Sequence, residues 1–227
     1  MVTERRSRAD RHLEEPLIAP EVRSRAERKE QTRQRLLEVT FKLIADRSLA
    51  SISLREVARE AGIVPTAFYR HYASMDELGV DLVDEAMRPL RQMIRDARRG
   101  RAAHSDIIVE TVAVLAKQVR ENPDQFRFLS RERYGGIGSV RRAIATELRL
   151  FTSDLTVDLA RLTAGYDWTT EDLEMAASLM VAAMLTTVMD LLEVDQRHPE
   201  DVTALLDQAE RQLRLIALGM GQWLSKP

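Results

Sequence analysis

A group of hydroxyl, cationic and small side chains lies between Pro65 and Tyr72, at spacings that would place it on one face of a short helix. Phe68 and Tyr72 are four residues apart and would form the buried face. The opposite face then holds Thr66, Ala67, Tyr69, Arg70 and His71. Hydroxyl groups and cations bind phosphates, and small residues permit close contact with base edges and thymine methyl groups. This chemistry is typical of a helix that contacts DNA.

The residues before this helix predict the element that would hold it outward. Ser53 and Glu56 have the spacing of a capping box, and Gly62 is placed to end the resulting helix with a positive φ. Pro65 is favoured at a first helical position. The buried stripe would consist of Leu54, Val57, Ala58 and Ala61, with Ile63 filling the corner. We therefore predict two short helices, over 53–61 and 65–72, joined at Gly62. An ordinary helical hairpin with a solvated outer face is the alternative.

The rest of the sequence holds no grouping typical of catalysis or metal binding. The four histidines, His12, His71, His104 and His198, do not recur at ligand spacing. Ser130 has no histidine beside it in the sequence to activate it as a nucleophile. The chain has no cysteine, which excludes disulfide and thiolate chemistry. We expect a protein that is not an enzyme and that holds no metal or cofactor.

Charge is distributed unevenly along the 227 residues. Residues 1–72 contain 15 Lys and Arg against 11 Asp and Glu, whereas the remainder contains 19 against 25. A basic end on an acidic body is expected for a small DNA-binding head joined to a larger regulatory body. No apolar segment typical of a signal peptide follows the N-terminus. The longest uncharged stretch, 176–189, is shorter than the roughly 20 residues that span a bilayer. We expect a soluble, cytoplasmic protein.

Apolar residues recur at helical spacing along most of the chain, and no strand-like alternation of useful length appears. We therefore expect an all-α fold with about nine helices. Residues 1–24 are polar and predict a disordered arm, 25–73 a DNA-binding domain of three helices, and 74–227 a ligand-binding and dimerisation domain. The other helices are expected over 25–46, 74–99, 105–121, 123–133, 139–163, 170–193 and 200–224.

The last two expected helices are unusually apolar. Ser178–Met189 is a run of twelve residues without a charge. A helix that is apolar all round must be covered on every side. The following helix, over 200–224, also repeats apolar residues at helical intervals. Two such helices can pair with the same two of a second subunit, so we predict a homodimer, with packing inside one chain as the alternative.

These motifs make the sequence similar to the TetR family of bacterial transcriptional repressors. The matching segments are TRQRLLEVTFKLI (32–44), SLREVAREAGI (53–63) and PTAFYRHY (65–72), and the similarity covers about 25–82. Within the family, LREVAREAGI (54–63) followed by PTAFYRH (65–71) looks like the FabR/DesT-type repressors of unsaturated fatty-acid synthesis. Further segments share that likeness: DELG (76–79), VDE (83–85) and FRFLSRER (126–133).

The resemblance implies that the helix over 65–72 lies in the major groove of an operator. It assigns DNA contacts to Pro65 and to the five outer-face residues named above. It also implies a contact from Arg55 in the preceding helix. Thr32 and Ser53, taken as helix starts, would bind phosphates through hydroxyl and backbone N–H groups.

Methionine and aromatic residues of the body could surround a hydrophobic ligand, because methionine is flexible and polarizable. The candidate pocket residues are Met87, Leu90, Met93, Ile94, Phe126, Leu129, Phe151, Leu155, Met180 and Met184. From the residues alone, ordinary core filling is the favoured explanation. The resemblance favours a long-chain acyl thioester such as acyl-CoA as the effector. Its phosphates would then be bound by some of Arg98, Arg99, Arg101, Arg131 and Arg133.

The expected function is a dimeric repressor that binds a palindromic operator and regulates fatty-acid metabolism. A bound acyl thioester would change the angle of the helix over 74–99, which carries the head, and so shift the population of DNA-competent dimers. Two alternatives stay open. The same architecture could sense a drug or another metabolite and control efflux or catabolic genes. Alternatively, the chain could be an all-α acyl-binding protein without a role on DNA.

Overall fold

The computed structural model describes residues 24–99, 104–163 and 168–223, without the side chains of 93–99 and 104–106. Within these ranges the secondary structure is entirely helical, as predicted. The elements are α1 (Arg25–Leu43), η1 (Leu49–Ser51), α2 (Leu54–Glu60), α3 (Pro65–Phe68), α4 (Met75–Arg99), α5 (His104–Glu121), α6 (Pro123–Glu132), α7 (Gly138–Leu162), α8 (Thr170–Glu193) and α9 (Pro199–Met220). Apart from Ser24, the expected arm lies outside the described residues.

Most helix starts are explained by local sequence. Ser24 and Glu27 form a reciprocal capping box at α1, and the hydroxyl of Thr169 accepts from the backbone of Asp172 at α8. Proline occupies the first turn of α3, α6 and α9, where its missing N–H leaves no hydrogen bond unmade. Helix α3 is shorter than expected, because the chain continues from Tyr69 to His71 as a turn.

Helix α4 runs through Pro89 without a break in its assignment. A proline inside a helix removes one backbone donor and disfavours straight continuation. Pro89 therefore separates the half of α4 that packs against the head from the half that extends along the body.

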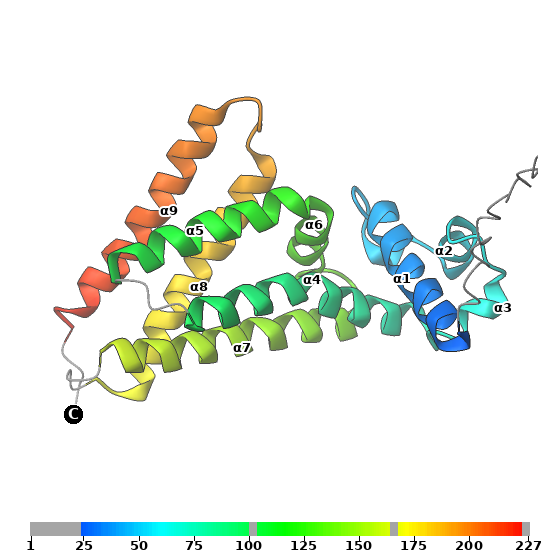
Figure 1. Ribbon diagram of the computed structural model, residues 1–227, viewed down its shortest axis with the longest axis horizontal. Coiled ribbons are helices and arrows are strands. Elements are labelled where there is room, and N and C mark those ends of the chain that lie inside the picture. The colour runs from blue at the N-terminus through cyan, green and yellow to red at the C-terminus, as the bar shows by residue number, and fades with distance from the viewer. Residues whose placement is uncertain (1–23, 100–103, 164–167, 224–227) are drawn as a thin grey trace, which may run out of the picture.

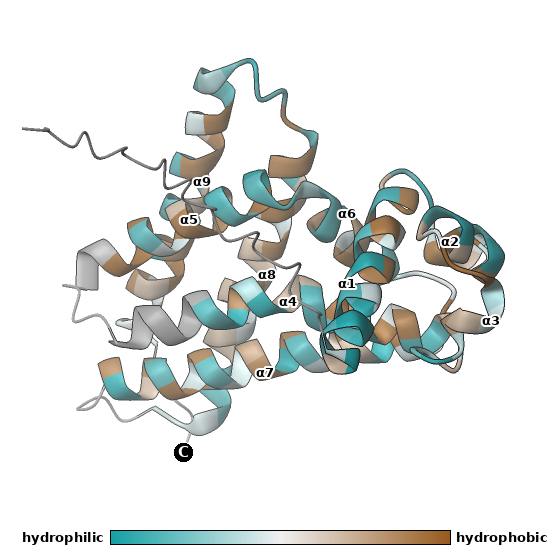
Figure 2. Cartoon of the chain, turned by 45° about the vertical axis from the view of Figure 1, so that its right-hand side comes forward, coloured by the Kyte–Doolittle hydropathy of each residue, from teal (hydrophilic) through white to brown (hydrophobic). Residues whose placement is uncertain are grey.

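The molecule consists of a head, formed by residues 24–72, and a body formed by α4 to α9. In Figure 1 the head lies at one end of the elongated chain, and α4 and α7 run from it along the body. Figure 2 shows hydrophobic residues gathered where α1, α2 and α3 face one another. Helix α6 ends beside α1, so the head is joined to the body at two places.

The core of the head continues into the body. Its buried residues form one cluster, the junction cluster, with the first half of α4, the end of α6 and the start of α7. Phe68 on α3, Leu78 on α4 and Val140 on α7 are all completely buried there. The apolar core is therefore continuous across the boundary expected at residue 73.

Gly79 permits the closest packing in the junction cluster. A Cβ atom at this position would lie 2.6 Å from Leu49 Cδ2 and 2.6 Å from Val140 Cγ2. Both neighbouring side chains are almost completely buried. Nearby, Ser139 Oγ donates to Asp76 Oδ2 over 2.8 Å and joins the starts of α7 and α4. Helix α4 can lie between η1 and α7 at this distance because residue 79 has no side chain.

The body contains three further hydrophobic clusters, and none is as large as the junction cluster. One joins α5, α6, α8 and α9 around Phe126. A second joins α7 and α8 around Leu159, and a third joins α5 and α9 around Val112. Leu90, Met180 and Met184 each pack against two clusters, so they lie where these cores meet.

Helix α8 is the one helix in the described residues that is long and apolar enough to cross a membrane, with a window mean hydropathy of 1.8. The length of the uncharged stretch 176–189 is therefore a poor guide to the length of this helix, which has 24 residues. However, α8 packs through Ala177, Val188 and Leu191 against the neighbouring helices of the body. This arrangement is that of a core helix that keeps one apolar face uncovered.

We expect Gly79→Ala to reduce the free energy of unfolding by about 1–3 kcal/mol, because the added methyl group overpacks a closed core. Denaturant unfolding at fixed protein concentration measures the change. The matched control is Gly136→Ala, because the nearest atom to a Cβ placed there, Ala50 Cβ, lies 4.0 Å away. This control should be neutral or stabilising by up to roughly 0.5–1 kcal/mol. Equal stabilities for the two variants would contradict the packing role of Gly79.

Candidate nucleic-acid interface

The corner between α2 and α3 has the geometry predicted from its glycine. Gly62 has φ +70°, and no other residue in the described ranges has a positive φ. Its N–H donates to Arg59 O over 3.0 Å, and Ile63 N–H donates to Ala58 O over 2.9 Å. These two bonds form a Schellman motif that satisfies carbonyls at the end of α2. The chain therefore turns sharply and directs α3 away from α2.

Two aromatic residues hold α3 against the core, as predicted. Phe68 is completely buried and Tyr72 is 4% exposed. The Tyr72 hydroxyl donates to Asp81 Oδ2 on α4, and Arg33 of α1 donates to Asp81 Oδ1. Burial, together with this hydrogen bond to a carboxylate, raises the pKa of Tyr72, so the hydroxyl stays protonated and continues to donate. Asp81 on α4 thus links α1 and the segment after α3. The sequence patterns used above carried no signal for this partnership.

The opposite face of α3 is open to solvent. Thr66 and Arg70 are exposed, Tyr69 is 62% exposed, and Ala67 is half-buried. The Tyr69 ring packs edge to face against the ring of Phe68, and the two ring centroids are 6.0 Å apart. This contact orients the tyrosine without covering it. The side chains that suit DNA are therefore presented together.

His71 is half-buried at the edge of this face. Burial, and then the nearby charges of Lys29 and Arg70, lower its pKa below 6.5. Its Nδ1 has no hydrogen-bond partner within the protein. At neutral pH the ring is therefore uncharged, and it offers hydrogen bonding more than positive charge.

Other residues beside α3 widen the candidate interface. Pro65 and Arg55 are exposed as expected. Val64, which precedes Pro65, is 64% exposed and was not singled out in the sequence. Arg35 of α1 lies beside the α2–α3 corner, close to Gly62. The interface thus combines cations with an exposed apolar side chain, and apolar groups can contact thymine methyls.

The capping box expected at α2 forms only in half. Ser53 Oγ accepts from Glu56 N–H over 3.2 Å. However, the Glu56 carboxylate accepts from Arg47 Nη1 over 2.8 Å and does not return to the Ser53 amide. The reciprocal bond was predicted wrongly, because Arg47 in the preceding loop competes for the carboxylate.

The helix-start role assigned to Thr32 was also wrong. Helix α1 begins at Arg25, so Thr32 lies in its interior and its hydroxyl donates to Arg28 O over 2.9 Å. An interior residue has its backbone N–H committed to the helix. A phosphate contact from Thr32 would therefore have to come from the side chain alone.

The candidate pocket residues of the body do not form one group. Met87, Leu129 and Phe151 pack in or against the junction cluster, whereas Phe126 and Leu155 belong to other clusters. Leu90, Met180 and Met184 lie between clusters, and the side chains of Met93 and Ile94 lie outside the described residues. The ligand pocket stays a prediction.

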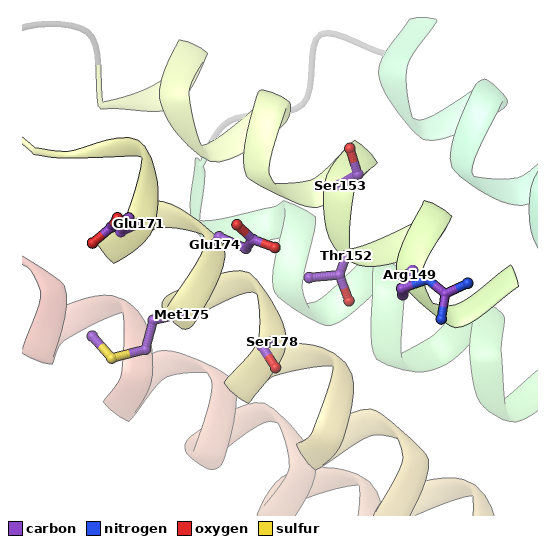
Figure 3. A pocket seen from close by; sticks show the side chains of 7 residues that line it. All are labelled: Arg149, Thr152, Ser153, Glu171, Glu174, Met175 and Ser178. Atoms are coloured by element: carbon purple, nitrogen blue, oxygen red, sulfur yellow. The ribbon is translucent and has the colours of Figure 1, made fainter. Parts of the chain in front are cut away.

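Two surface hollows lie elsewhere. The larger, of about 590 Å³, lies between α7 and α8 and is lined by Arg149, Thr152, Glu174 and Ser178, among others (Figure 3). The second, of about 340 Å³, lies between α8 and α9 and is lined by Ala182, Thr186 and Leu215, among others. Neither hollow contains a candidate pocket residue.

Two arginines expected to be available as phosphate anchors have other surroundings. Arg131 donates to three backbone carbonyls just after α1, so its guanidinium group is already occupied and does not serve as a phosphate anchor. Arg133 lies over the ring of Tyr134. The side chains of Arg98, Arg99 and Arg101 are outside the described residues. Within the described part of the chain, no three His, Asp or Glu residues are grouped so that they could hold a metal ion.

Comparison with known families decides what this arrangement is. Residues 36–81 match the model of bacterial regulatory proteins of the tetR family, and residues 105–214 match the tetracyclin repressor-like C-terminal domain. Together the two models cover more than half of the chain. The chain belongs to the TetR family. This TetR-family protein is therefore a DNA-binding transcriptional regulator with a helix-turn-helix head, and it is not an enzyme.

Solved structures with the same fold include several regulators. The fatty acid degradation regulator FadR from Bacillus halodurans is 15% identical with a TM-score of 0.63, covering 80% of this chain and 94% of that one. A TetR-family regulator from Streptomyces coelicolor is 20% identical with a TM-score of 0.65, covering 82% and 96%. GusR from Salmonella enterica is 20% identical with a TM-score of 0.62, covering 81% and 96%. These matches share the fold, and they do not support the closer FabR/DesT-type resemblance.

We expect Arg55→Ala and Tyr69→Ala to weaken operator binding. If Arg55 contacts a phosphate, its removal should also reduce the slope of log K against log salt by about 0.9. Fluorescence anisotropy over a series of salt concentrations measures both quantities. The controls are Arg161→Ala and Tyr134→Ala, which change exposed residues of the body. Unchanged affinity in both head variants would contradict the proposed interface.

Proposed function

We propose that this TetR-family regulator is a cytoplasmic repressor that binds a palindromic operator as a homodimer and responds to a small hydrophobic effector. The outward face of α3 carries the proposal. Thr66 on α3 and Tyr69 and Arg70 in the turn that follows it are exposed, while buried Phe68 and Tyr72 anchor the opposite side. Such a helix can enter a major groove without disturbing the head. Operator selection from random DNA duplexes tests this role directly, and failure to enrich any sequence would reject it.

Uncovered apolar residues on α8 and α9 support dimerisation. Leu179 is 53% exposed, Leu215 is 72% exposed and Leu218 is 73% exposed. Only 28% of the most apolar window of α8 is buried within one chain. Figure 2 shows hydrophobic residues along both helices. Exposed apolar surface of this kind is typical of a protein–protein interface, and a second copy would bring the two heads that a palindrome requires.

We expect Leu179→Glu to convert the dimer into a monomer, because it would place a charge in the apolar interface. Light scattering coupled to size-exclusion chromatography measures the mass. Leu150→Glu on α7 is the matched control, since Leu150 is also 53% exposed but lies outside α8 and α9. A Leu179→Glu protein that remains dimeric at low micromolar concentration would contradict this interface.

The effector would enter where the body clusters meet. Leu90, Met180 and Met184 each pack against two clusters, and two of the three are methionines. Contacts between separate clusters can part without disrupting either core, and flexible methionines can repack around a ligand. A long acyl chain is compatible with such a site. The similar fold of a fatty acid degradation regulator is likewise compatible with this effector class.

The effector's influence would reach the head through α4. This helix contributes Leu78 and Leu82 to the junction cluster and extends into the body beyond Pro89. A ligand that favours one orientation of the part of α4 beyond Pro89 would change how many dimers have their two heads at the separation that DNA binding requires. A drug or other metabolite acting at the same place is the second candidate. An acyl-binding protein without a DNA role has no observation in its favour, given the family and the open face of α3.

We expect palmitoyl-CoA or oleoyl-CoA to change operator affinity by about 5–150-fold, the usual range of coupling between two sites. Met184→Trp should reduce this change by filling the proposed site, while basal affinity stays the same. Val157→Trp is the control, because Val157 is 47% exposed and lies on α7, outside both the proposed site and the dimer interface. Titrations of the protein–operator complex measure the effect. Identical affinity with and without both thioesters would reject acyl sensing, and native mass spectrometry showing a copurified polycyclic cation would favour the drug-sensor alternative.

A further inference from the structure

The end of α6 makes a polar attachment to the head. Arg131 Nη1 donates to Ile44 O over 2.7 Å and to Arg47 O over 2.6 Å, and its Nη2 donates to Ala45 O over 2.9 Å. These carbonyls follow the end of α1, where helical partners run out. A guanidinium group therefore binds the segment that follows α1 from a residue more than 80 positions away in the sequence.

The next residue attaches α6 to η1. Glu132 Oε1 accepts from Leu49 N–H over 2.8 Å and from Ser48 Oγ over 3.0 Å. Glu132 is 1% exposed. One turn earlier in α6, Phe128 packs edge to face against Phe41 of α1, with ring centroids 5.8 Å apart. Arg131, Glu132 and Phe128 thus hold the segment that links α1 to α2.

Glu132 is poorly suited to a role that is only stabilising. Its second oxygen, Oε2, is buried and has no hydrogen-bond partner within the protein. Gly135 is needed to accommodate it, because a Cβ at residue 135 would lie 2.1 Å from Oε2. A buried carboxylate that is half satisfied costs stability, whereas the directional bonds of its other oxygen fix position. This combination favours a positional role.

We propose that Arg131 and Glu132 are positioning residues that fix the orientation of the head on the body and thereby set the separation of the two recognition helices in the dimer. The proposal rests on the dimeric DNA-binding function. Helix α4 alone would leave the head free to turn about the axis of that helix. A second attachment, made by the end of α6 to the segment after α1, removes this freedom. A movement of the body would then change the orientation of the head through the end of α6 as well as through α4.

Half-site spacing tests the proposal. One added base pair moves a half-site by about 3.4 Å and rotates it by roughly 35°, so a rigid dimer should reject it. The probes are the operator selected by the wild-type chain and versions with one base pair added or removed at its centre. Arg131→Met and Glu132→Met should reduce discrimination against the altered spacings by about tenfold, the factor for loss of one hydrogen bond to a charged group. Wild-type discrimination in both variants would overturn the proposal.

Controls separate positioning from general stability. Arg133→Met is the matched substitution, because Arg133 adjoins the attachment but contacts Tyr134. It should keep wild-type discrimination, and equal loss in this variant would overturn the specific role of Arg131. If the methionine variants do not fold, Arg131→Lys and Gly135→Ala carry the test. Lysine lacks the planar fork, and alanine at 135 would displace the Glu132 carboxylate without changing any charge.

A measurement without DNA makes failure of this proposal distinguishable from failure of the proposed function. The chain contains no cysteine, so a single Glu60→Cys change in the exposed end of α2 reports one position in each subunit. Spin-label distance measurements should give a narrow head-to-head distribution in this labelled parent. Arg131→Met in the same background should broaden it. Equal widths would reject the positioning role, whatever the DNA affinity.

Discussion

The rest of the structure depends on the continuity of the junction cluster between head and body. A head of about fifty residues buries so small a fraction of its surface that its own core would be only marginally stable. Its hydrophobic core is therefore completed by residues from the first half of α4, the end of α6 and the start of α7. Gly79 marks the tightest point of this packing, where α4 lies against Leu49 and Val140. Because the core is shared, a movement of the body cannot leave the head unaffected.

This shared core also explains how so short a recognition helix is held in place. Helix α3 has four residues, which is far below the length of an independently stable helix. Its position comes from buried Phe68, the Schellman turn at Gly62 and the hydrogen bond from Tyr72 to Asp81. All three act from the side that faces the protein. The outer side is thereby left to Thr66, Tyr69 and Arg70, which a DNA-binding regulator requires.

Apolar side chains are mostly covered in the head, but many remain exposed on the two last helices, α8 and α9. In the head, the large apolar side chains are buried or partly buried, with Val64 and Tyr69 as the exposed exceptions among the described residues. In α8 and α9, large apolar side chains remain exposed along helices that are already packed on another face. An apolar helix with one covered and one uncovered face fits a subunit interface better than a bilayer. The same property thus serves folding in one region and association in the other.

The sequence by itself determined the elements whose signals are local. Proline placed the starts of α3 and α6, Gly62 placed the turn before α3, and the spacing of Phe68 and Tyr72 predicted which face would be buried. Family membership followed from the same residues. Tertiary structure alone decided the partners of charged side chains. Glu56 pairs with Arg47, Asp81 joins Arg33 to Tyr72, and Arg131 binds carbonyls of the segment that follows α1. Long ionic side chains choose among distant partners by geometry, and sequence spacing does not encode that geometry.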